Sequence, residues 1–521
     1  LNRATTFVYD ADGNLLRVTD PLNHSVTTTY DRGRVKEVRD TNNKLVLSNL
    51  YNAKGQLTQS KDALNQVTTY AYFDCGAPKT VSQQVTINGV LKTLNTSYAL
   101  SSDGRFNIAG VTDAKGHSTS FTYDLNGNKT TQSTTRTLSG GAVEVLTTTY
   151  EYDKLDRVTK TVAPDNTVSR TIYNAIGKVE KTIQAAGSGF ERETQHIYDE
   201  LGQRTKTIYA DSSFSRTEYN DNGQVERSYD RAGRITRSIY DTLGRMVSSQ
   251  LYDAAGNLVS NGGKTIYDDA GQVTQQIDEL GRSTYFDYDG GGRQEKVWDE
   301  LHPRTSGTPV SHTIYDELNR VTSVSDALNR STTFRYDDLG RQTHTYLPHT
   351  QADGPDASTR SYVETRYDEL GRAIARRDQA GRWKKFVFDE LGRLVQTRLG
   401  TDSNPQPAST DLVTRFGFDE LGRKVWQQDA EGWKNDRANG IAEDVAPVSR
   451  VTRFAYDKVG RLIGRQLPNG KSESMTYYPT GQLQTKTDFN GFVTTFTYDL
   501  RGRLLSKTPD SRKGEAVITY S

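Results

Sequence analysis

Cysteine is almost missing from this chain: Cys75 is the only one in 521 residues. A single thiol cannot form an internal disulfide, and it cannot supply the Cys₂His₂ or Cys₄ ligands of a structural zinc site. Charge of one sign is missing too, because 66 Lys and Arg balance 65 Asp and Glu to a net charge of +1. This balance argues against nucleic acid or an acidic membrane surface as a partner recruited by bulk charge.

Apolar residues are also scarce. They make up 33% of the chain even when Tyr is counted, against about 45–50% in ordinary globular domains. No run approaches the roughly 18 apolar residues of a membrane span, so we expect none. A compact globule of this length would bury about three quarters of its surface. The composition therefore predicts something thinner, with one covered face and much backbone in turns.

A repeat of about 21 residues fills the chain. Residues 326–337 (DALNRSTTFRYD) and 488–499 (DFNGFVTTFTYD) share Thr-Thr-Phe-x-Tyr-Asp, and D-x-x-G-R begins at the last Asp. Counting the aromatic residue before each such turn gives 21 anchors, from Tyr9 to Tyr498. Eleven of the 20 intervals are 21 residues long and the others are longer, 25 to 38. A fixed minimum with one-sided insertions indicates one structural unit with one tolerant loop.

The letters of the unit predict a β-hairpin. T-x-F-x-Y alternates and is β-branched and aromatic, which is typical of a strand. In D-x-x-G-R, Asp and Gly suit a type I turn whose left-handed Gly makes a G1 bulge. Residues 504–508 form a return strand, and a second turn, D-x-x-N/G, follows. No segment has helical periodicity of useful length, so we predict an all-β chain: a continuous antiparallel meander of about 21 hairpins.

The predicted site residues are structural: the anchor, Asp, Gly and Arg of five repeats. They are Tyr336, Asp337, Gly340 and Arg341; Tyr367, Asp368, Gly371 and Arg372; Phe388, Asp389, Gly392 and Arg393; Phe418, Asp419, Gly422 and Arg423; and Tyr498, Asp499, Gly502 and Arg503. We expect Tyr498 to pair with Leu504 on one face of the sheet, and Asp499 to meet Arg503 on the other. An isolated hairpin is marginal in water, so the units must stabilise one another.

The insertions predict how the ribbon is arranged. Those in residues 181–194, 301–312, 342–362, 394–412 and 424–450 all fall in the second turn, which leaves one edge uniform and decorates the other. About 42 strands at about 4.8 Å each give a ribbon of about 200 Å, and such twisted sheets do not stay flat. Coiling into a spiral would bring the decorated edge of one turn near the uniform edge of the next. The coil would be wide enough to surround a folded domain.

Residues with reactive chemistry form no recognisable site. The closest histidines, His344 and His349, belong to a Pro-containing stretch, and Cys75 has no C-x-x-C partner. Asp20-Pro21 fits an ordinary second turn. We therefore expect no catalytic residues, metal site or cofactor, and no enzyme activity. Both ends of residues 1–521 cut a repeat in mid-pattern, so we expect one repeat region that is a section of a longer polypeptide.

Tyr-Asp-x-x-Gly-Arg repeats of about 21 residues resemble the YD or RHS (rearrangement hotspot) repeats, and the resemblance covers essentially the whole chain. Such repeats occur in bacterial RHS polymorphic toxins, in the shell subunits of insecticidal Tc toxins and, more distantly, in animal teneurins. The resemblance implies a hollow shell made from a spiralling β-ribbon. In the bacterial members the shell encloses a C-terminal toxin domain, which is cut off and later released. Their self-cleaving segment with DPxG-type motifs has no counterpart here.

The resemblance implies a structural function. We expect the wall of a shell that sequesters a toxin or effector domain, with that domain and further shell segments of the same polypeptide as partners. The full-length protein would be secreted or act at the cell surface, in competition between bacteria. The alternative is an adhesion or glycan-binding ribbon, with carbohydrate as the partner. Neither hypothesis involves nucleic acid.

Overall fold

Nearly all of the regular structure is β. The computed structural model describes residues 4–87, 89–138, 140–348, 361–401, 411–442 and 445–520. Strands account for 53% of the chain and helix for 3%. The 44 strands form one antiparallel sheet that is not closed, and each strand pairs with the next along the chain. This confirms the predicted all-β meander.

The strands run in chain order around the ribbon. The first half comprises β1 Thr6–Tyr9, β2 Leu15–Thr19, β3 Ser25–Asp31, β4 Arg34–Arg39, β5 Leu45–Tyr51, β6 Leu57–Asp62, β7 Val67–Tyr72, β8 Pro78–Ile87, β9 Val90–Leu100, β10 Ile108–Thr112, β11 Ser118–Tyr123, β12 Lys129–Thr137, β13 Val143–Tyr152, β14 Val158–Val162, β15 Val168–Tyr173, β16 Val179–Gln184, β17 Arg192–Tyr198, β18 Arg204–Ile208, β19 Phe214–Tyr219, β20 Val225–Tyr229, β21 Ile235–Tyr240 and β22 Met246–Tyr252.

The second half comprises β23 Leu258–Ser260, β24 Lys264–Tyr267, β25 Val273–Ile277, β26 Ser283–Tyr288, β27 Gln294–Trp298, β28 Ser311–Tyr315, β29 Val321–Asp326, β30 Ser331–Tyr336, β31 Gln342–Tyr346, β32 Tyr362–Tyr367, β33 Ala373–Arg377, β34 Trp383–Phe388, β35 Leu394–Gly400, β36 Leu412–Phe418, β37 Lys424–Gln428, β38 Val451–Tyr456, β39 Leu462–Gln466, β40 Ser472–Tyr477, β41 Leu483–Thr487, β42 Val493–Tyr498, β43 Leu504–Thr508 and β44 Ile518–Thr519. Two 3₁₀ turns, Arg304–Ser306 and Ser511–Lys513, and one helix, α1 Ala430–Ala438, complete the regular structure.

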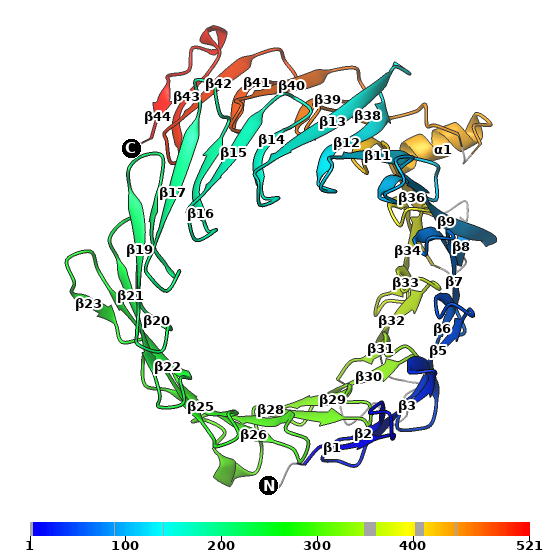
Figure 1. The fold of residues 1–521 in the computed structure, drawn as a ribbon, viewed down its shortest axis with the longest axis vertical. Helices are drawn as coiled ribbons and strands as arrows, with labels where there is room; N and C mark the ends of the chain where they lie inside the picture. Colours follow the sequence, from blue (N-terminus) through cyan, green and yellow to red (C-terminus); the bar gives the residue numbers. More distant parts are fainter. Residues whose placement is uncertain are drawn as a thin grey trace.

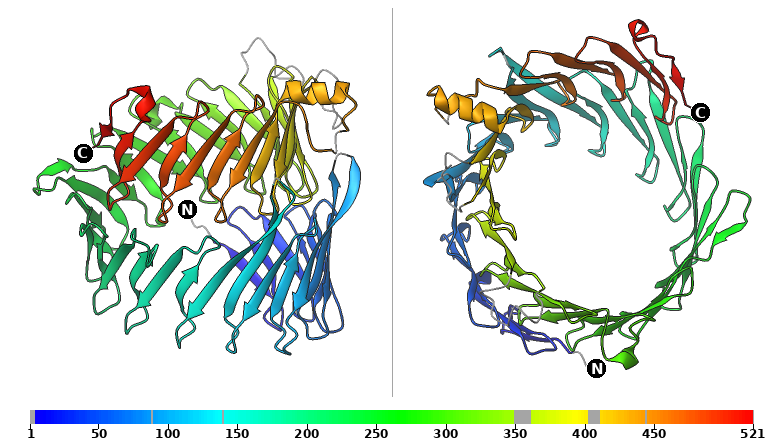
Figure 2. Two further views of the ribbon diagram at one scale, coloured as in Figure 1. Left: turned by 90° about the horizontal axis from the view of Figure 1, so that it is seen from above. Right: turned by 180° about the vertical axis from the view of Figure 1, so that it is seen from behind.

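The ribbon coils into a spiral that overlaps itself (Figure 1). From β1 it follows a ring through β9, β17 and β26, and then passes along β32 and β40 in a second tier, which Figure 2 shows in side view. The turn between β42 and β43 contacts the turn between β18 and β19 through Arg501 and Asp211. The ribbon thus meets its own edge after 24 strands. We call β1–β26 the first pass and β27–β44 the second pass.

The two edges of the ribbon carry different turns. The D-x-x-G-R turns form one edge, which we call the turn edge, and the D-x-x-N/G turns and insertions form the other, the second-turn edge. Leu22, on the second-turn edge of the first pass, lies against Gly290 and Gly291 on the turn edge of the second pass. The decorated edge of one pass therefore meets the uniform edge of the next, as the sequence predicts.

Helix α1 is a departure from the expectation that no segment is helical. It lies in the insertion between β37 and β38, and the Asp429 side chain caps it by accepting from Gly432 N. Trp433 and Asp436 are buried, and the Asp436 carboxylate accepts from the backbone N–H groups of Val448 and Ser449. Hydrophobic periodicity could not reveal this helix, because polar contacts with the following loop hold it in place.

Two details of the repeat also differ from the prediction. Leu100, rather than Tyr98, holds the anchor position of its hairpin, because Leu100 pairs with Ile108 next to the bulge. The turn that follows spans residues 101–107 and is longer than four residues. The ranges assigned to insertions also include strand ends, such as β35 within residues 394–412. Part of that range and of 342–362, including His349, lies outside the described residues.

Candidate functional site: the seam between the two passes

The repeated turn is built by one aspartate. In Asp389–Arg393, Gly392 N donates to Asp389 O at 3.0 Å, and Asp389 N donates to Arg393 O at 2.9 Å. Gly392 and Gly422 both have φ of 77°, the left-handed conformation that favours glycine. Asp389 Oδ1 also accepts from Leu391 N and Arg393 N. The Asp side chain therefore replaces backbone partners inside the turn, which explains why Asp recurs at this position.

The arginine of each turn joins one hairpin to the next. Arg341 Nε donates to Asp337 Oδ2 at 2.7 Å, within its own turn. Arg341 Nη1 donates to Asp368 O at 3.0 Å, in the next turn, and its guanidinium carbon lies 4.7 Å from the centre of the Tyr367 ring. Arg320, Arg372, Arg393, Arg423 and Arg461 repeat this arrangement.

These contacts correct one prediction about the faces of the sheet. Tyr498 does pair with Leu504, and Arg503 Nε does donate to Asp499 Oδ2, at 2.8 Å. The arginines, however, contact the aromatic rings of neighbouring repeats rather than lying on the opposite face. The reason is the bulge, which re-aims the side chain that follows the left-handed glycine.

The anchor tyrosines add a second link between hairpins. Tyr336 OH donates to Val321 O at 2.6 Å, and Tyr367 OH donates to Gln342 O at 2.9 Å. In each case the accepting carbonyl belongs to the first residue of the return strand in the preceding hairpin. Phe388 and Phe418 occupy the same position without a hydroxyl, so these repeats depend on the arginine alone.

The five predicted repeats do not converge on one pocket. Each set of anchor, Asp, Gly and Arg forms its own turn, and the turns follow one another along the turn edge of the second pass. This edge faces the second-turn edge of the first pass, and we call the contact between the two edges the seam. The seam is the candidate functional site, because it joins segments about 270–320 residues apart in the sequence into one wall.

Glutamates at the second position of the turns make the seam contacts. Glu369 accepts from Thr86 Oγ1 at 2.7 Å and from Thr86 N at 3.2 Å. Glu420 Oε2 accepts from Thr137 N at 3.0 Å, and Glu390 pairs with the ammonium group of Lys92. Asp338, at the same turn position, pairs with Lys44. The acids come from the second pass and the donors from the first.

Further contacts extend the seam along the ring. Lys115 Nζ lies 3.4 Å from Asp389 Oδ2. Arg136 Nη1 donates to the carbonyls of Tyr456 and Asp457, at 3.2 and 3.0 Å. The remaining pairs are Asp165 with Arg461, Arg192 with Gln482, Asp211 with Arg501 and Phe190 with Tyr478. The seam is thus a line of charged and polar contacts with one aromatic pair.

The seam carboxyl groups stay ionised to unusually low pH. Burial alone would raise the pKa of Glu390, but the hydrogen bond from Lys92 and the charges of Lys92 and Lys115 outweigh it and lower the pKa. Burial also opposes the shift at Glu369 and Glu420, where hydrogen bonds from Thr86 and Thr137 lower the pKa. The seam therefore favours the charged forms of these three side chains.

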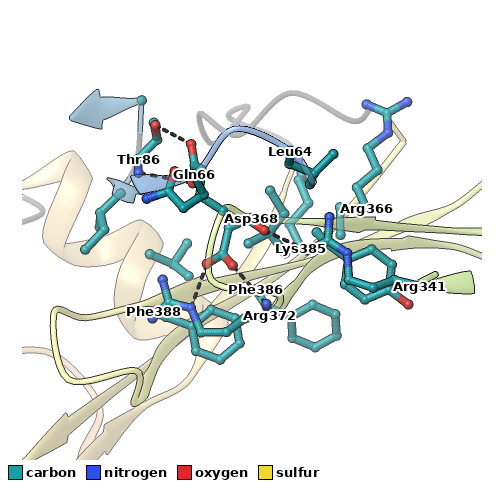
Figure 3. Close-up of a pocket in the computed structure, with 17 residues that line it drawn as sticks. Leu64, Gln66, Thr86, Arg341, Arg366, Asp368, Arg372, Lys385, Phe386 and Phe388 are labelled. Carbon is teal, nitrogen blue, oxygen red and sulfur yellow. Dashed lines mark hydrogen bonds and ion pairs between the residues drawn. The ribbon is translucent and has the colours of Figure 1, made fainter. Parts of the chain in front are cut away.

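A cavity of about 630 Å³ opens on the seam (Figure 3). Leu64, Gln66 and Thr86 line it from the first pass, and Phe386 and Phe388 line it from the second. In Figure 3 Asp368 and Arg372 point toward one another beside this cavity, and the Thr86–Glu369 contact closes one side of it. The charged groups at the cavity are thus held by wall contacts.

The sequence analysis missed the seam glutamates, although a signal for them exists. An acid occupies the second position of the turn in D-E-L-N (317), D-D-L-G (338) and D-E-L-G (369, 390 and 420), all in the second pass. The corresponding position in most first-pass turns is Ala, Arg, Lys, Leu or Thr. Comparing this position along the chain, rather than only the invariant letters, would have distinguished the seam edge from the free edge.

The other candidate residues take no part in a site. Cys75 is exposed in a turn. Asp20 opens a second turn in which Asn23 N donates to its carbonyl at 3.0 Å, and His24 Nδ1 lies 3.1 Å from its carboxylate. In the described ranges no three His, Cys, Asp or Glu residues are placed to hold a metal ion. Among the same residues, no helix has the length and apolarity needed to cross a bilayer.

Comparison with known proteins agrees with the repeat and the fold. A family model described as RHS Repeat matches residues 9–44, 267–297, 315–352 and 477–513. No curated protein matches the chain. The crystal structures of TcdB2-TccC3 and TcdB2-TccC3-Cdc42 match it with TM-scores of 0.62 and 0.63 at 16% and 15% identity.

The match to these two structures covers 99% of this chain, but 29% and 31% of theirs. The chain thus spans less than a third of their length, and at this identity the likeness is one of fold. Together with the 21-residue repeat and its Tyr-Asp-x-x-Gly-Arg turns, these matches show that the chain is an RHS/YD-repeat protein.

Proposed function

We propose that this chain is a section of the wall of a shell that encloses and sequesters a toxin or effector domain of the same polypeptide. The observation that carries the proposal is the seam. A ribbon that merely curved would leave an open groove between its passes, whereas the contacts of Glu369, Glu390 and Glu420 join the passes into one surface. Such a surface can separate an interior from its surroundings.

The number of strands in one turn of the spiral supports an interior of useful size. Closed antiparallel sheets of 22 strands enclose a lumen that a plug of folded chain fills. This ribbon returns to its own edge after 24 strands, as the contact between Arg501 and Asp211 shows. A wall of this curvature can hold polypeptide, and its function would be physical exclusion rather than catalysis.

The remaining parts of the proposal concern the complete protein. The matched TcdB2-TccC3 chains are more than three times as long as the segment they share with this chain. We therefore propose that further shell segments complete the chamber, and that the complete protein is secreted or acts at the cell surface in competition between bacteria. The enclosed domain would be kept from the producing cell and from proteases until release.

Limited proteolysis of the complete polypeptide tests the enclosure. We expect a segment outside residues 1–521 to resist proteinase K while the shell is intact, and to become sensitive when Glu369, Glu390 and Glu420 are changed together to Lys. A map of the intact protein by electron cryomicroscopy should show density inside the ring. Equal cleavage rates in both proteins, with the remaining chain outside the ring, would contradict the proposal. Binding to a glycan array together with that result would favour the adhesion alternative.

A further inference from the structure

The turn edge of the first pass leaves an uncovered arc of four turns. These are Asp199–Gly202, Asn220–Gly223, Asp241–Gly244 and Asp268–Gly271, which we call the free turn arc. Leu201 and Leu243, at the third turn position, are 84% and 71% exposed. In the second pass, Leu339 and Leu421 hold the same position and are 36% and 39% exposed, because the seam partly covers them.

The second-turn edge shows the same contrast. Leu22 and Leu64, at the third position of second turns in the first pass, are partly covered at the seam, where Leu22 contacts Gly290 and Gly291. The turns that follow in the chain hold the same leucine without a covering pass. They are Asp278–Gly281, Asp299–His302 and Asp326–Asn329, which we call the free second-turn arc, and their exposed leucines are Leu280, Leu301 and Leu328.

Charge on the two free arcs is complementary in the same sense as at the seam. Between the first and last residues of its turns, the free turn arc carries Glu200, Asp221 and Asp269, all exposed, and no Lys or Arg. The free second-turn arc carries the exposed side chains of Arg282 and Arg330. At the seam, likewise, the acids Glu390 and Asp338 lie on the turn edge and the bases Lys92 and Lys44 on the second-turn edge.

We propose that the free turn arc is a docking surface for the free second-turn arc of a second copy of this chain. Each arc reproduces one side of the seam, an interface that this chain already forms with itself, and the copy supplies the missing side. The contact is heterologous, so one copy stacks on another head to tail and the assembly does not close at two. Rows of leucine with 70–85% exposure are the surfaces that such a contact would cover.

Sedimentation velocity of the described chain tests the proposal. We expect the wild-type protein to form dimers and longer species as its concentration rises over a hundred-fold range. Leu201→Asp with Leu243→Asp should abolish association by removing the free turn arc. Leu280→Asp with Leu328→Asp should do the same through the other arc. These side chains are exposed, so the melting temperature of each variant should stay near that of the wild type.

Mixing the two variants separates this contact from general stickiness. Each variant keeps the arc that the other has lost, so an equimolar mixture should form a dimer and nothing larger. Ile314→Asp, an exposed position within β28 and on neither arc, is the matched control and should associate like the wild type. A monomeric wild type over the whole range, undiminished association of either variant, or a mixture that stays monomeric would overturn the proposal.

Discussion

A single aspartate determines the shape of each repeated turn. Asp389 accepts from two backbone N–H groups of its own turn and forms an ion pair with Arg393. Burial would raise its pKa, but the hydrogen bonds from Arg393 and the nearby charges of Arg393 and Lys115 lower it. The carboxylate therefore remains charged at neutral pH and keeps all of these partners. Asn174 and Asn220 open turns of the same kind through the same backbone contacts.

Substituting a turn glycine should strain the backbone rather than create a clash. We expect Gly392→Val to lower the free energy of unfolding of its hairpin by about 1–2 kcal/mol, the cost of placing a β-branched residue in the left-handed region. A Cβ at this position would meet only Arg372 Nη1 at 3.6 Å, an ordinary contact. Gly392→Asn is the control and should cost less, because Asn319 adopts φ of 63° in the corresponding turn. Hydrogen exchange should show the loss confined to β34 and β35; global unfolding would contradict the repeat-array view.

The element that the sequence repeats is the hairpin, and the arginine after each turn couples hairpins to one another. Arg341 belongs to the hairpin of β30 and β31 but contacts Tyr367 and Asp368 of the next hairpin. Coupling of this kind explains how a sheet with few fully buried apolar side chains holds together. Each hairpin is stabilised by its neighbours, as in other repeat arrays.

Changing this arginine to lysine should weaken the coupling while keeping the charge. Lysine cannot form the paired hydrogen bonds of a guanidinium group or stack on a ring in the same way. We expect Arg341→Lys to cost about 1–2 kcal/mol of unfolding free energy and to speed amide exchange in β32. The control is Arg382→Lys, because Arg382 pairs only with the Asp378 side chain, at 65% exposure. Equal effects of the two changes would contradict the coupling role of Arg341.

For the whole molecule, the seam determines whether the spiral is a wall or an open coil. Exposed ion pairs each contribute about 0–1 kcal/mol, so no single seam pair is decisive. The contacts act together because the sheet fixes the spacing of the turns on both edges. Breaking several of them should separate the passes without unfolding the hairpins.

Charge reversal at three turns tests the seam directly. We expect Glu369→Lys, Glu390→Lys and Glu420→Lys together to increase the radius of gyration measured by small-angle X-ray scattering, because Lys92 would then face a like charge. The far-UV circular dichroism spectrum should not change. Glu200→Lys is the matched control: it lies in the turn D-E-L-G outside the seam, and its change should leave the scattering of a dilute sample unaltered. An unchanged triple variant would disprove the role of these glutamates.

The seam should open in acid but persist at mildly acidic pH. The pKa of Glu369, Glu390 and Glu420 is lower in the folded chain than in the unfolded chain, where it is about 4.3. Their contribution to stability is therefore complete above about pH 4.3 and is lost as the pH falls through the lowered folded values. Exchange of the Thr137 amide, corrected for its intrinsic rate, should accelerate below that pH. Exchange of the Gly202 amide should not change in the same way; loss of Thr137 protection near pH 6 would contradict this account.

Much of the fold could be predicted from the sequence because the information is local. The left-handed conformation of Gly392, the pairing of Tyr498 with Leu504 and the meander all follow from residues close together in the chain. Even the short turn of residues 31–34 is explained locally: Arg32 and Gly33 both have positive φ, as a two-residue hairpin turn requires.

The candidate site could be predicted only in part. Coiling of the ribbon implied that two different edges would meet, but not which turns would face each other. That register depends on the curvature accumulated over 24 strands, and a small change of twist at each strand would shift Glu369 away from Thr86. Helix α1 was missed for a related reason, because Asp436 and the loop after it stabilise it through contacts outside the helix.

The sequence by itself determined the hairpin, its bulged turn and the antiparallel order of the strands, because each depends on contacts within one or two repeats. Only the tertiary structure decided where the ribbon meets itself, which leucines are covered and which glutamates find a lysine or an amide. Those outcomes depend on the sum of many small rotations between strands, which no single repeat encodes.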